Sequence, residues 1–278
     1  MNETAKTIKW CAIGDSFTYL NDHLDETAYR VKKGYLTRTC GFFTNLSVIN
    51  MGMNGSATQD WVNVKLPEAD LYTVLLGTND WHGGVPLGSR EDFAKKREGT
   101  ILGNLGVLVS HIRETAPEAV LLVMNPVERG DFVYILDPCN NAHGSYMPDQ
   151  GQWLSDIAQG ICDTCCAEGI PTLNLHDLSG FTPENVVRFK WVNTPEGYRQ
   201  LPYPDYTRIP VRFGEDAYPK DEYPKDEYPK DEYPFPPEAA DFTYDGLHPS
   251  DKGNEVIASL LAARLLELLG GRLSPREA

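Results

Sequence analysis

Short apolar runs alternate with longer amphipathic segments along most of this chain. The runs have the length of a buried strand, and several are rich in Val, Ile and Leu. In the segments between them, apolar residues recur every three or four positions, which is the spacing of a helix that buries one face. The runs predict five strands, over Ile8–Ile13, Leu46–Asn50, Leu71–Leu76, Val120–Met124 and Thr172–Leu175.

Two of the helical segments are especially clear. In the first, apolar residues recur from Ile101 to Ile112, and Pro117 closes the segment. In the second, a single apolar stripe runs from Ile257 to Leu268, and the following Gly270 suits the left-handed position that ends a helix. This alternation of strands and helices predicts an α/β fold with a mostly parallel sheet and helices on both of its faces.

One region, about residues 181–240, breaks this alternation, because prolines, aromatics and charges lie there without a clean period. Dividing 278 residues by about 150 per domain would suggest two domains. Without the roughly 60 residues of this region, however, about 220 remain, which suits one α/β domain. We therefore expect a single domain over residues 1–278 with one insertion at 181–240.

The insertion contains a tandem repeat over residues 218–234. The unit Tyr-Pro-Lys-Asp-Glu begins at Tyr218, Tyr223 and Tyr228, and a fourth copy starts at Tyr233. A proline in every unit argues against helix and strand and favours an extended or turn-rich chain. We interpret the repeat as a solvated surface segment, with the edge of a lid or a partner-binding arm as the alternative.

Composition excludes several classes of partner. The chain carries 25 Lys and Arg against 40 Asp and Glu, which gives a formal net charge of −15. Phosphate neutralisation needs clustered cations, so this charge argues against a nucleic-acid partner and against an anionic membrane surface. No charge-free apolar run approaches the roughly 18 residues of a membrane span.

The cysteines and the first residues of the chain bear on the cellular location of the protein. The six cysteines are too few and too scattered for a disulfide scaffold, and the first residues lack the apolar stretch of a signal peptide. Cys162 and Cys165 form a C-x-x-C near the end of a predicted helix, which favours core packing over redox chemistry. We expect a cytoplasmic protein, and the sequence carries no signal for its oligomeric state.

Four short motifs each follow a predicted strand or precede a predicted helix. The loops at the carboxyl ends of parallel strands share one edge of the sheet, where ligands bind in open α/β sheets. These motifs are therefore expected to meet at one site. They are Gly14-Asp15-Ser16, Asn50-Met51-Gly52-Met53-Asn54-Gly55, Gly77-Thr78-Asn79-Asp80 and Asp245-Gly246-Leu247-His248-Pro249.

The residue types in these motifs suit ester chemistry by a serine nucleophile. The Ser16 hydroxyl needs a base to accept its proton, and His248 is the natural base because its ordinary pKa lies near neutrality. Asp245, three residues earlier, can orient the imidazole. The backbone N–H groups of Ser16 and Gly55 and the side-chain amide of Asn79 are candidate donors for an oxyanion hole.

Taken together and in this order, the motifs resemble those of the SGNH hydrolase family, also called GDSL esterases and lipases. The resemblance covers about residues 7–269 outside the insertion. It implies a three-layer α/β/α sandwich with a flavodoxin-like, mostly parallel five-stranded sheet, and ester hydrolysis through an acyl-enzyme without a metal or cofactor. It implies Ser16 as nucleophile, His248 as base, Asp245 as its partner, and Gly55 and Asn79 as oxyanion donors.

This chain departs from the family pattern at three points. Phe17 stands in place of the usual Leu, and the insertion has no counterpart. Gly52 also lies in the second motif, so the choice of Gly55 rests on its spacing from Asn50. Asp15 and Asp80 are interpreted as turn and loop supports.

For the substrate, a small-molecule ester is expected, with an O-acetylated carbohydrate as the first hypothesis. Tyr19, Trp81, Tyr146 and Trp153 could offer stacking faces, and Trp81 and His82 are candidate substrate-binding residues. A short-chain acyl esterase or thioesterase, or a lysophospholipase-like enzyme, is the alternative.

Two other classes of protein stay open. One is a metal-dependent phosphoesterase, for which the Asp-x-His and Gly-His-x-His patterns are missing. The other is a non-catalytic binding protein that uses the Tyr-Pro repeat as a ligand. The metal ligands in the first would be Asp15, Asp80, His82, Asp245 and His248.

Overall fold

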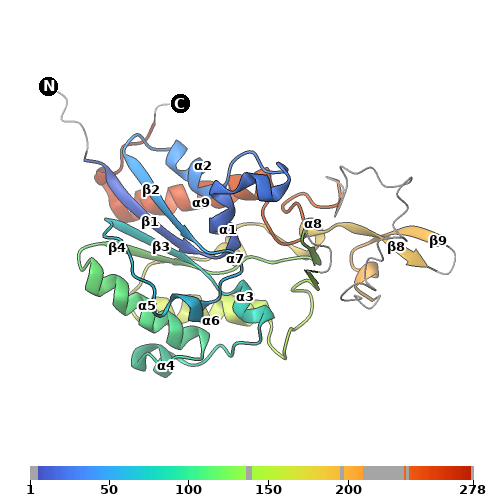
Figure 1. Ribbon diagram of the computed structural model, residues 1–278, viewed down its shortest axis with the longest axis horizontal. Helices are drawn as coiled ribbons and strands as arrows, with labels where there is room; N and C mark the ends of the chain where they lie inside the picture. The colour runs from blue at the N-terminus through green and yellow to red at the C-terminus, as the bar shows by residue number, and fades with distance from the viewer. Residues whose placement is uncertain (1–5, 136–139, 195–196, 209–234, 236–237, 277–278) are drawn as a thin grey trace.

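In the computed structural model, five parallel strands form the central sheet in the order β2-β1-β3-β4-β7 (Figure 1). The structure describes residues 6–135, 140–194, 197–208, 235 and 238–276. All five strands begin at or within a few residues of the predicted positions, and the α/β class is confirmed. They are β1 (Ile8–Gly14), β2 (Leu46–Gly52), β3 (Leu71–Leu75), β4 (Val120–Met124) and β7 (Thr172–Leu173).

Helices cover both faces of the sheet and complete three layers (Figure 1). One apolar core lies between the sheet and the pair α2 and α9, and a second core lies between the sheet and α5 and α6. The helices are α1 (Ser16–Tyr19), α2 (Tyr35–Gly41), α3 (Thr78–His82), α4 (Arg90–Lys95), α5 (Ile101–Thr115), α6 (Leu154–Ala167), α7 (Leu175–Leu178), α8 (Pro183–Val186) and α9 (Asp251–Leu269).

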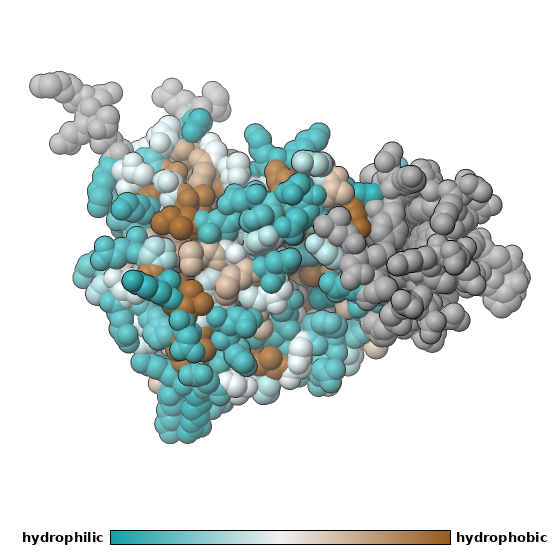
Figure 2. All heavy atoms as spheres, in the orientation of Figure 1, coloured by the Kyte–Doolittle hydropathy of each residue, from teal (hydrophilic) through white to brown (hydrophobic). Residues whose placement is uncertain are grey.

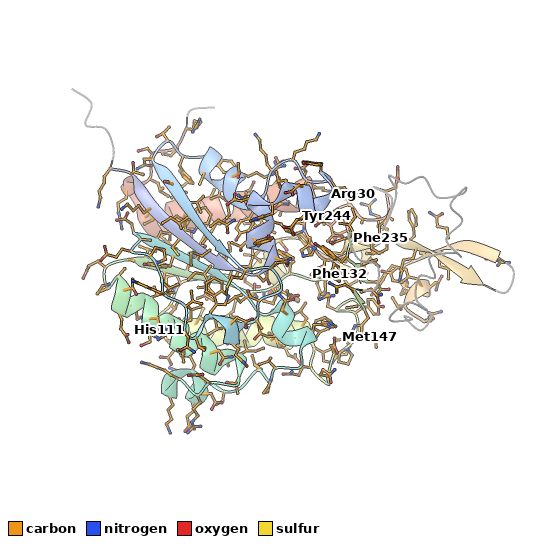
Figure 3. The ribbon with its side chains drawn as sticks, in the orientation of Figure 1. Arg30, His111, Phe132, Met147, Phe235 and Tyr244 are labelled. Atoms are coloured by element: carbon orange, nitrogen blue, oxygen red, sulfur yellow. The ribbon has the colours of Figure 1, made fainter. Side chains whose placement is uncertain are left out.

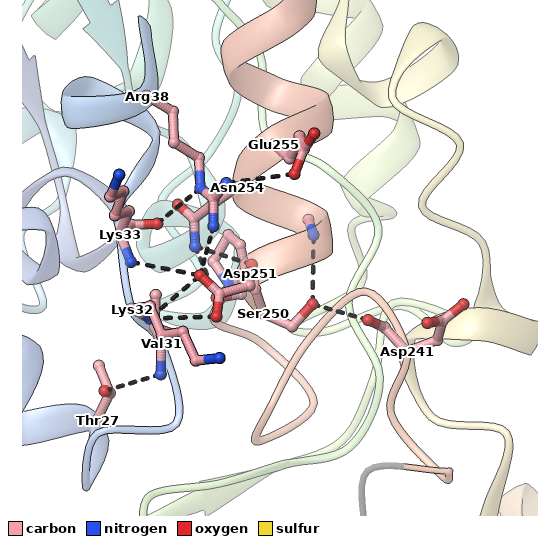
Figure 4. Close-up of polar contacts among 12 residues, drawn as sticks. Thr27, Val31, Lys32, Lys33, Arg38, Asp241, Ser250, Asp251, Asn254 and Glu255 are labelled. Carbon is pink, nitrogen blue, oxygen red and sulfur yellow. Dashed lines mark hydrogen bonds and ion pairs between the residues drawn. The ribbon is translucent and has the colours of Figure 1, made fainter. Parts of the chain in front are cut away.

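The last helix, α9, is fixed at the end that adjoins the fourth motif. Ser250 caps it by accepting a hydrogen bond from the backbone N–H of Gly253. Asp251 accepts hydrogen bonds from the backbone N–H groups of Lys32 and Lys33 and from the Arg38 guanidinium (Figure 4). These bonds tie the start of α9 to the segment before α2, so the chain just ahead of it has a defined position.

The structure differs from the predicted elements in two places. The predicted strand over Thr172–Leu175 is shorter, because Asn174 caps α7 and Leu175 already belongs to that helix. Part of the insertion is regular: β8 (Phe189–Thr194) and β9 (Gly197–Pro202) form an antiparallel hairpin that projects from the body (Figure 1). The repeat over 218–234 lies outside the described residues.

Surface and core composition follow the expected pattern. Hydrophilic residues cover most of the coloured face in Figure 2, with small, separate hydrophobic patches between them. Within the described residues, no helix combines the length and apolar character needed to span a bilayer. Cys162 and Cys165 are buried in α6, as expected for core packing, and burial raises their pKa values to about 11 and about 12.

Candidate active site

The first motif forms a tight turn at the carboxyl end of β1. A Cβ on Gly14 would lie 2.0 Å from Thr18 Oγ1, so this close approach requires glycine. Asp15 then caps α1, because its side chain accepts a hydrogen bond from the backbone N–H of Phe17 at 3.0 Å. Ser16 is therefore the first residue of α1, placed directly beyond the edge of the sheet.

The structure brings Ser16, His248 and Asp245 into a continuous hydrogen-bonded chain. His248 Nδ1 lies 2.6 Å from Asp245 Oδ2, and His248 Nε2 lies 2.8 Å from Ser16 Oγ. An ionised carboxylate only accepts hydrogen bonds, so Nδ1 carries the proton and donates it to Asp245. Nε2 is then the free acceptor, and the Ser16 hydroxyl donates to it.

The backbone fixes the Asp245 carboxylate. Its Oδ1 accepts hydrogen bonds from the backbone N–H groups of Leu247 at 3.0 Å and His248 at 2.7 Å, which leaves Oδ2 for the imidazole. The turn between them needs Gly246, whose φ is +90° and whose Cβ would lie 1.9 Å from the Asp131 carbonyl oxygen. The spacing of three residues between acid and base thus follows from one tight, glycine-dependent turn.

Aromatic side chains enclose the imidazole. The ring centroids of Phe17, Phe132 and Tyr244 lie 5.9, 5.5 and 5.9 Å from that of His248. Phe132 and Tyr244 lie close to Phe235 and Arg30 at the end of the sheet nearest the hairpin (Figure 3). Ser16 is 3% exposed and His248 4% exposed, so the hydroxyl and its acceptor are shielded from water.

The other two candidate oxyanion donors lie in the loop after β2 (Gly55) and in the first turn of α3 (Asn79). Asn79 Nδ2 donates one hydrogen bond to the Ser56 carbonyl at 2.9 Å, which orients the amide. An amide nitrogen carries two N–H groups, so the other one remains to donate to an oxyanion. Gly55 has a φ of +71°, and no described residue accepts a hydrogen bond from its backbone N–H. The N–H of Gly52, in contrast, donates to Asn50 Oδ1 at 2.8 Å. This difference favours Gly55 over Gly52 as a donor.

Two acidic residues of the motifs serve as supports. Asp80 accepts hydrogen bonds from the backbone N–H and the hydroxyl of Thr58, so it joins α3 to the segment after β2. Burial raises the pKa of both carboxyl groups, in Asp15 to about 7. These contacts agree with the interpretation of Asp15 and Asp80 as turn and loop supports.

Trp81 does not offer the open stacking face that the sequence suggested. It is fully buried, its indole N–H donates to the Gln152 carbonyl at 2.8 Å, and His143 packs edge-on against its ring. Sequence composition cannot distinguish a packed aromatic from an exposed one, because both belong to the same residue type. Of the four aromatics, Trp153 is the most exposed, at 44%.

His82 stands at the end of α3 and faces a carboxylate. Its Nδ1 lies 2.8 Å from Asp149 Oδ2, and about half of its side chain is exposed. This position is compatible with a role at the rim of the site, but the contact with Asp149 already accounts for one of its ring nitrogens.

Arg129 belongs to the site and was missed from the sequence. It lies in the loop that follows β4, at the same edge of the sheet as the four motifs, and is 2% exposed. Its Cζ lies 5.4 Å from the Trp81 ring centroid and 5.8 Å from that of Phe132. A lone arginine in a loop has no sequence pattern, although its place after the fourth predicted strand was a usable signal.

These observations define an α/β protein with a serine, a histidine and an aspartate in contact at the carboxyl edge of its parallel sheet. A family model for the GDSL-like Lipase/Acylhydrolase family matches residues 12–206. The chain belongs to this family, and it is a hydrolase of that class.

Solved structures agree with this assignment. The chain is 42% identical to a possible lipase from Chitinophaga pinensis, with a TM-score of 0.84 over 94% of this chain and 98% of that one. Proteins from Lactobacillus plantarum (18% identity, TM-score 0.51, 94% and 98% covered) and Enterococcus faecalis (a lipase/acylhydrolase; 17%, 0.50, 98% and 100%) share the fold. No curated protein matches the chain.

Proposed function

We propose that this protein is a serine esterase that hydrolyses carboxylic esters through an acyl-enzyme. The observation that carries the proposal is the 2.8 Å contact from Ser16 Oγ to His248 Nε2, together with the 2.6 Å contact from Nδ1 to Asp245. A base within hydrogen-bond distance of a hydroxyl, oriented by a third group, is the arrangement that activates a serine nucleophile.

In the proposed acylation step, Ser16 Oγ attacks the ester carbonyl carbon while its proton passes to His248 Nε2. The carbonyl oxygen gains negative charge, and the N–H groups of Ser16 and Gly55 and the Asn79 amide stabilise it. When the tetrahedral intermediate collapses, the bond to the leaving oxygen breaks, and the proton on Nε2 passes to the departing alcohol. Water, deprotonated by the same nitrogen, then attacks the acyl-enzyme and releases the acid.

The direct test is turnover of p-nitrophenyl acetate by Ser16→Ala and His248→Ala. Both variants should lose activity by several orders of magnitude while retaining the unfolding midpoint of the parent protein. Ser110→Ala and His111→Ala are matched controls that should keep full activity, because both residues lie near the end of α5. Figure 3 shows His111 far from Phe132 and Tyr244, which enclose the His248 ring. Normal activity in Ser16→Ala would overturn the proposal.

The finer substrate class is a separate part of the proposal. An O-acetylated carbohydrate is one candidate, supported by the exposed ring of Trp153. A short-chain acyl ester or thioester and a lysophospholipid are the others. Hydrolysis of a series of acyl chain lengths, measured beside acetylated sugars under the same conditions, separates these candidates by their kcat/KM values.

We further propose a cytoplasmic location and a small-molecule substrate without nucleic-acid or membrane partners. The net charge of −15 supports the absence of nucleic-acid binding. The five described cysteines carry free thiols, which fits a reducing compartment. Fractionation of the source cells tests the location.

A further inference from the structure

Arg129 carries a buried charge without a hydrogen-bonding partner at two of its nitrogens. Neither Nε nor Nη2 has a partner among the described residues, although both atoms are shielded from solvent. A buried guanidinium that makes no such bonds is costly, because its N–H groups lose water without replacement. Burial lowers the pKa of Arg129 to about 10, so the group keeps its proton at neutral pH.

The carboxylates that surround Arg129 are already bonded to other groups. The negative charges of Asp245, Asp149, Asp131 and Asp15 all act on Arg129, yet none of these carboxylates is within ion-pair distance of it among the described residues. Three of the four have a nearer basic side chain, and Asp15 accepts a hydrogen bond from the backbone N–H of Phe17. Asp245 contacts His248 at 2.6 Å, Asp149 contacts His82 at 2.8 Å, and Asp131 contacts Lys190 at 2.6 Å.

The backbone holds Arg129 firmly beside the active site. Its own N–H donates to the Ser145 hydroxyl at 2.9 Å, and the next residue, Gly130, donates to the Gly246 carbonyl at 2.8 Å. Gly246 lies between Asp245 and His248, so the arginine loop is bonded to the turn that carries the acid and the base. Phe132 contacts both Arg129 and His248, because its ring lies 5.8 Å from Arg129 Cζ and 5.5 Å from the His248 ring.

The geometry points to Arg129 as a binding subsite for a carboxylate carried by the ester substrate. Nε and Nη2 lie on one edge of the guanidinium, and two parallel N–H groups match the two oxygens of a carboxylate. The substrate carboxylate would supply the two acceptors that Nε and Nη2 lack. Ser16 and Arg129 are both nearly closed to solvent, so substrate entry requires movement of side chains between them. Phe132 contacts both His248 and Arg129.

This inference rests on the proposed esterase function and narrows its substrate to esters with a free carboxylate. The test compares two pairs of esters. Mono-4-nitrophenyl glutarate and its methyl ester differ by a charge on the acyl side, whereas 4-acetoxybenzoate and its methyl ester differ on the alcohol side. The parent protein should favour the anionic member of one pair by about 10-fold or more in kcat/KM.

Arg129→Gln should lose this preference. A charge-assisted hydrogen bond is worth about 1.5–3 kcal/mol, so kcat/KM for the favoured anionic ester should fall about 10- to 100-fold, with less than about 3-fold change for its neutral partner. Arg90→Gln removes the same charge from an exposed ion pair with Glu168 and serves as the control, with both values unchanged. An equal loss on both members of the pair, or hydrolysis of the anionic and neutral esters at equal kcat/KM by the parent protein, overturns the inference.

A binding measurement separates this inference from the esterase proposal. Glutarate should bind to the Ser16→Ala variant in calorimetry, and the neutral diamide of glutarate should not. Adding Arg129→Gln should abolish binding of glutarate. If Ser16 proves inert toward esters while glutarate still binds through Arg129, the subsite stands and the esterase fails. If esters are hydrolysed but glutarate does not bind, the subsite is wrong and the esterase stands. Should Arg129→Gln fail to fold, the ester preference of the parent protein and the glutarate titration still decide.

Discussion

Replacing Asp245 with Asn changes which nitrogen of His248 carries the proton. In the parent protein, Asp245 Oδ1 accepts two backbone N–H groups and Oδ2 accepts the proton of Nδ1. Asparagine has only one acceptor oxygen. If that oxygen stays with the backbone groups of Leu247 and His248, the amide NH₂ faces Nδ1 and can only donate to it. The proton must then move to Nε2, which faces Ser16.

The opposite orientation of the amide is disfavoured by the backbone. Turning the oxygen toward Nδ1 would leave two buried N–H groups without an acceptor, at about 1–3 kcal/mol each. The orientation that misplaces the proton is therefore preferred by roughly 2–6 kcal/mol. A protonated Nε2 cannot accept from the Ser16 hydroxyl, and loss of the correct tautomer in a Ser-His-Asp site lowers kcat by about 10⁴.

The assay is p-nitrophenyl acetate hydrolysis at neutral pH by Asp245→Asn, with unfolding followed by circular dichroism. We expect kcat to fall by about 10⁴ while the unfolding midpoint stays near that of the parent. Asp163→Asn, on the exposed face of α6, is the matched control and should retain full activity. A kcat for Asp245→Asn within about 10-fold of the parent would refute the reasoning about the tautomer.

Three further predictions test the oxyanion hole, the buried cap and the core. Asn79→Ala should lower kcat by about 10²–10³ with little change in unfolding midpoint, and an unchanged kcat removes this amide from the hole. Burial raises the pKa of Asp15 from its ordinary value of 3.8 to about 7, so the folded protein holds this proton more tightly than the unfolded chain. The resulting stabilisation is fully present below about pH 4 and is lost as the pH rises to about 7. Asparagine at this position keeps the cap but does not titrate. In urea unfolding, the free energy of unfolding of Asp15→Asn relative to that of the parent should therefore increase between pH 4 and pH 8, on the order of 4 kcal/mol. A difference in unfolding free energy that stays constant with pH contradicts the burial effect. Leu261→Ala, in the core face of α9, should cost about 2–5 kcal/mol in the same assay, whereas the partly exposed Leu266→Ala should cost far less.

Much of the fold could be predicted because the inner strands of the sheet are buried on both faces. The run Leu71–Leu76, for example, is apolar except for Thr73, and the observed β3 covers Leu71–Leu75 with every residue buried. The hairpin of β8 and β9 was not predicted, since an insertion rich in proline, aromatics and charges has no period to identify it. Its pairing depends on contacts between two strands rather than on either strand alone.

The catalytic residues of the site could also be predicted from the sequence, whereas the packing around them could not. Ser16, Asp245 and His248 stand in short motifs whose residue types suit one chemistry, so their contact could be anticipated from the topology of a parallel sheet. The burial of Trp81 and the presence of Arg129 depend on how loops distant in sequence pack together. The sequence around neither residue contains a pattern that predicts this packing.

The esterase function proposed for this protein depends on activation of the Ser16 hydroxyl by His248. The most direct measurement is reaction with a fluorophosphonate, followed by mass spectrometry of the digested protein. We predict one adduct, located on Ser16, that forms rapidly in the parent protein and is slowed by orders of magnitude in His248→Ala. An adduct on another residue, or labelling of Ser16 at the same rate in both proteins, would contradict the account.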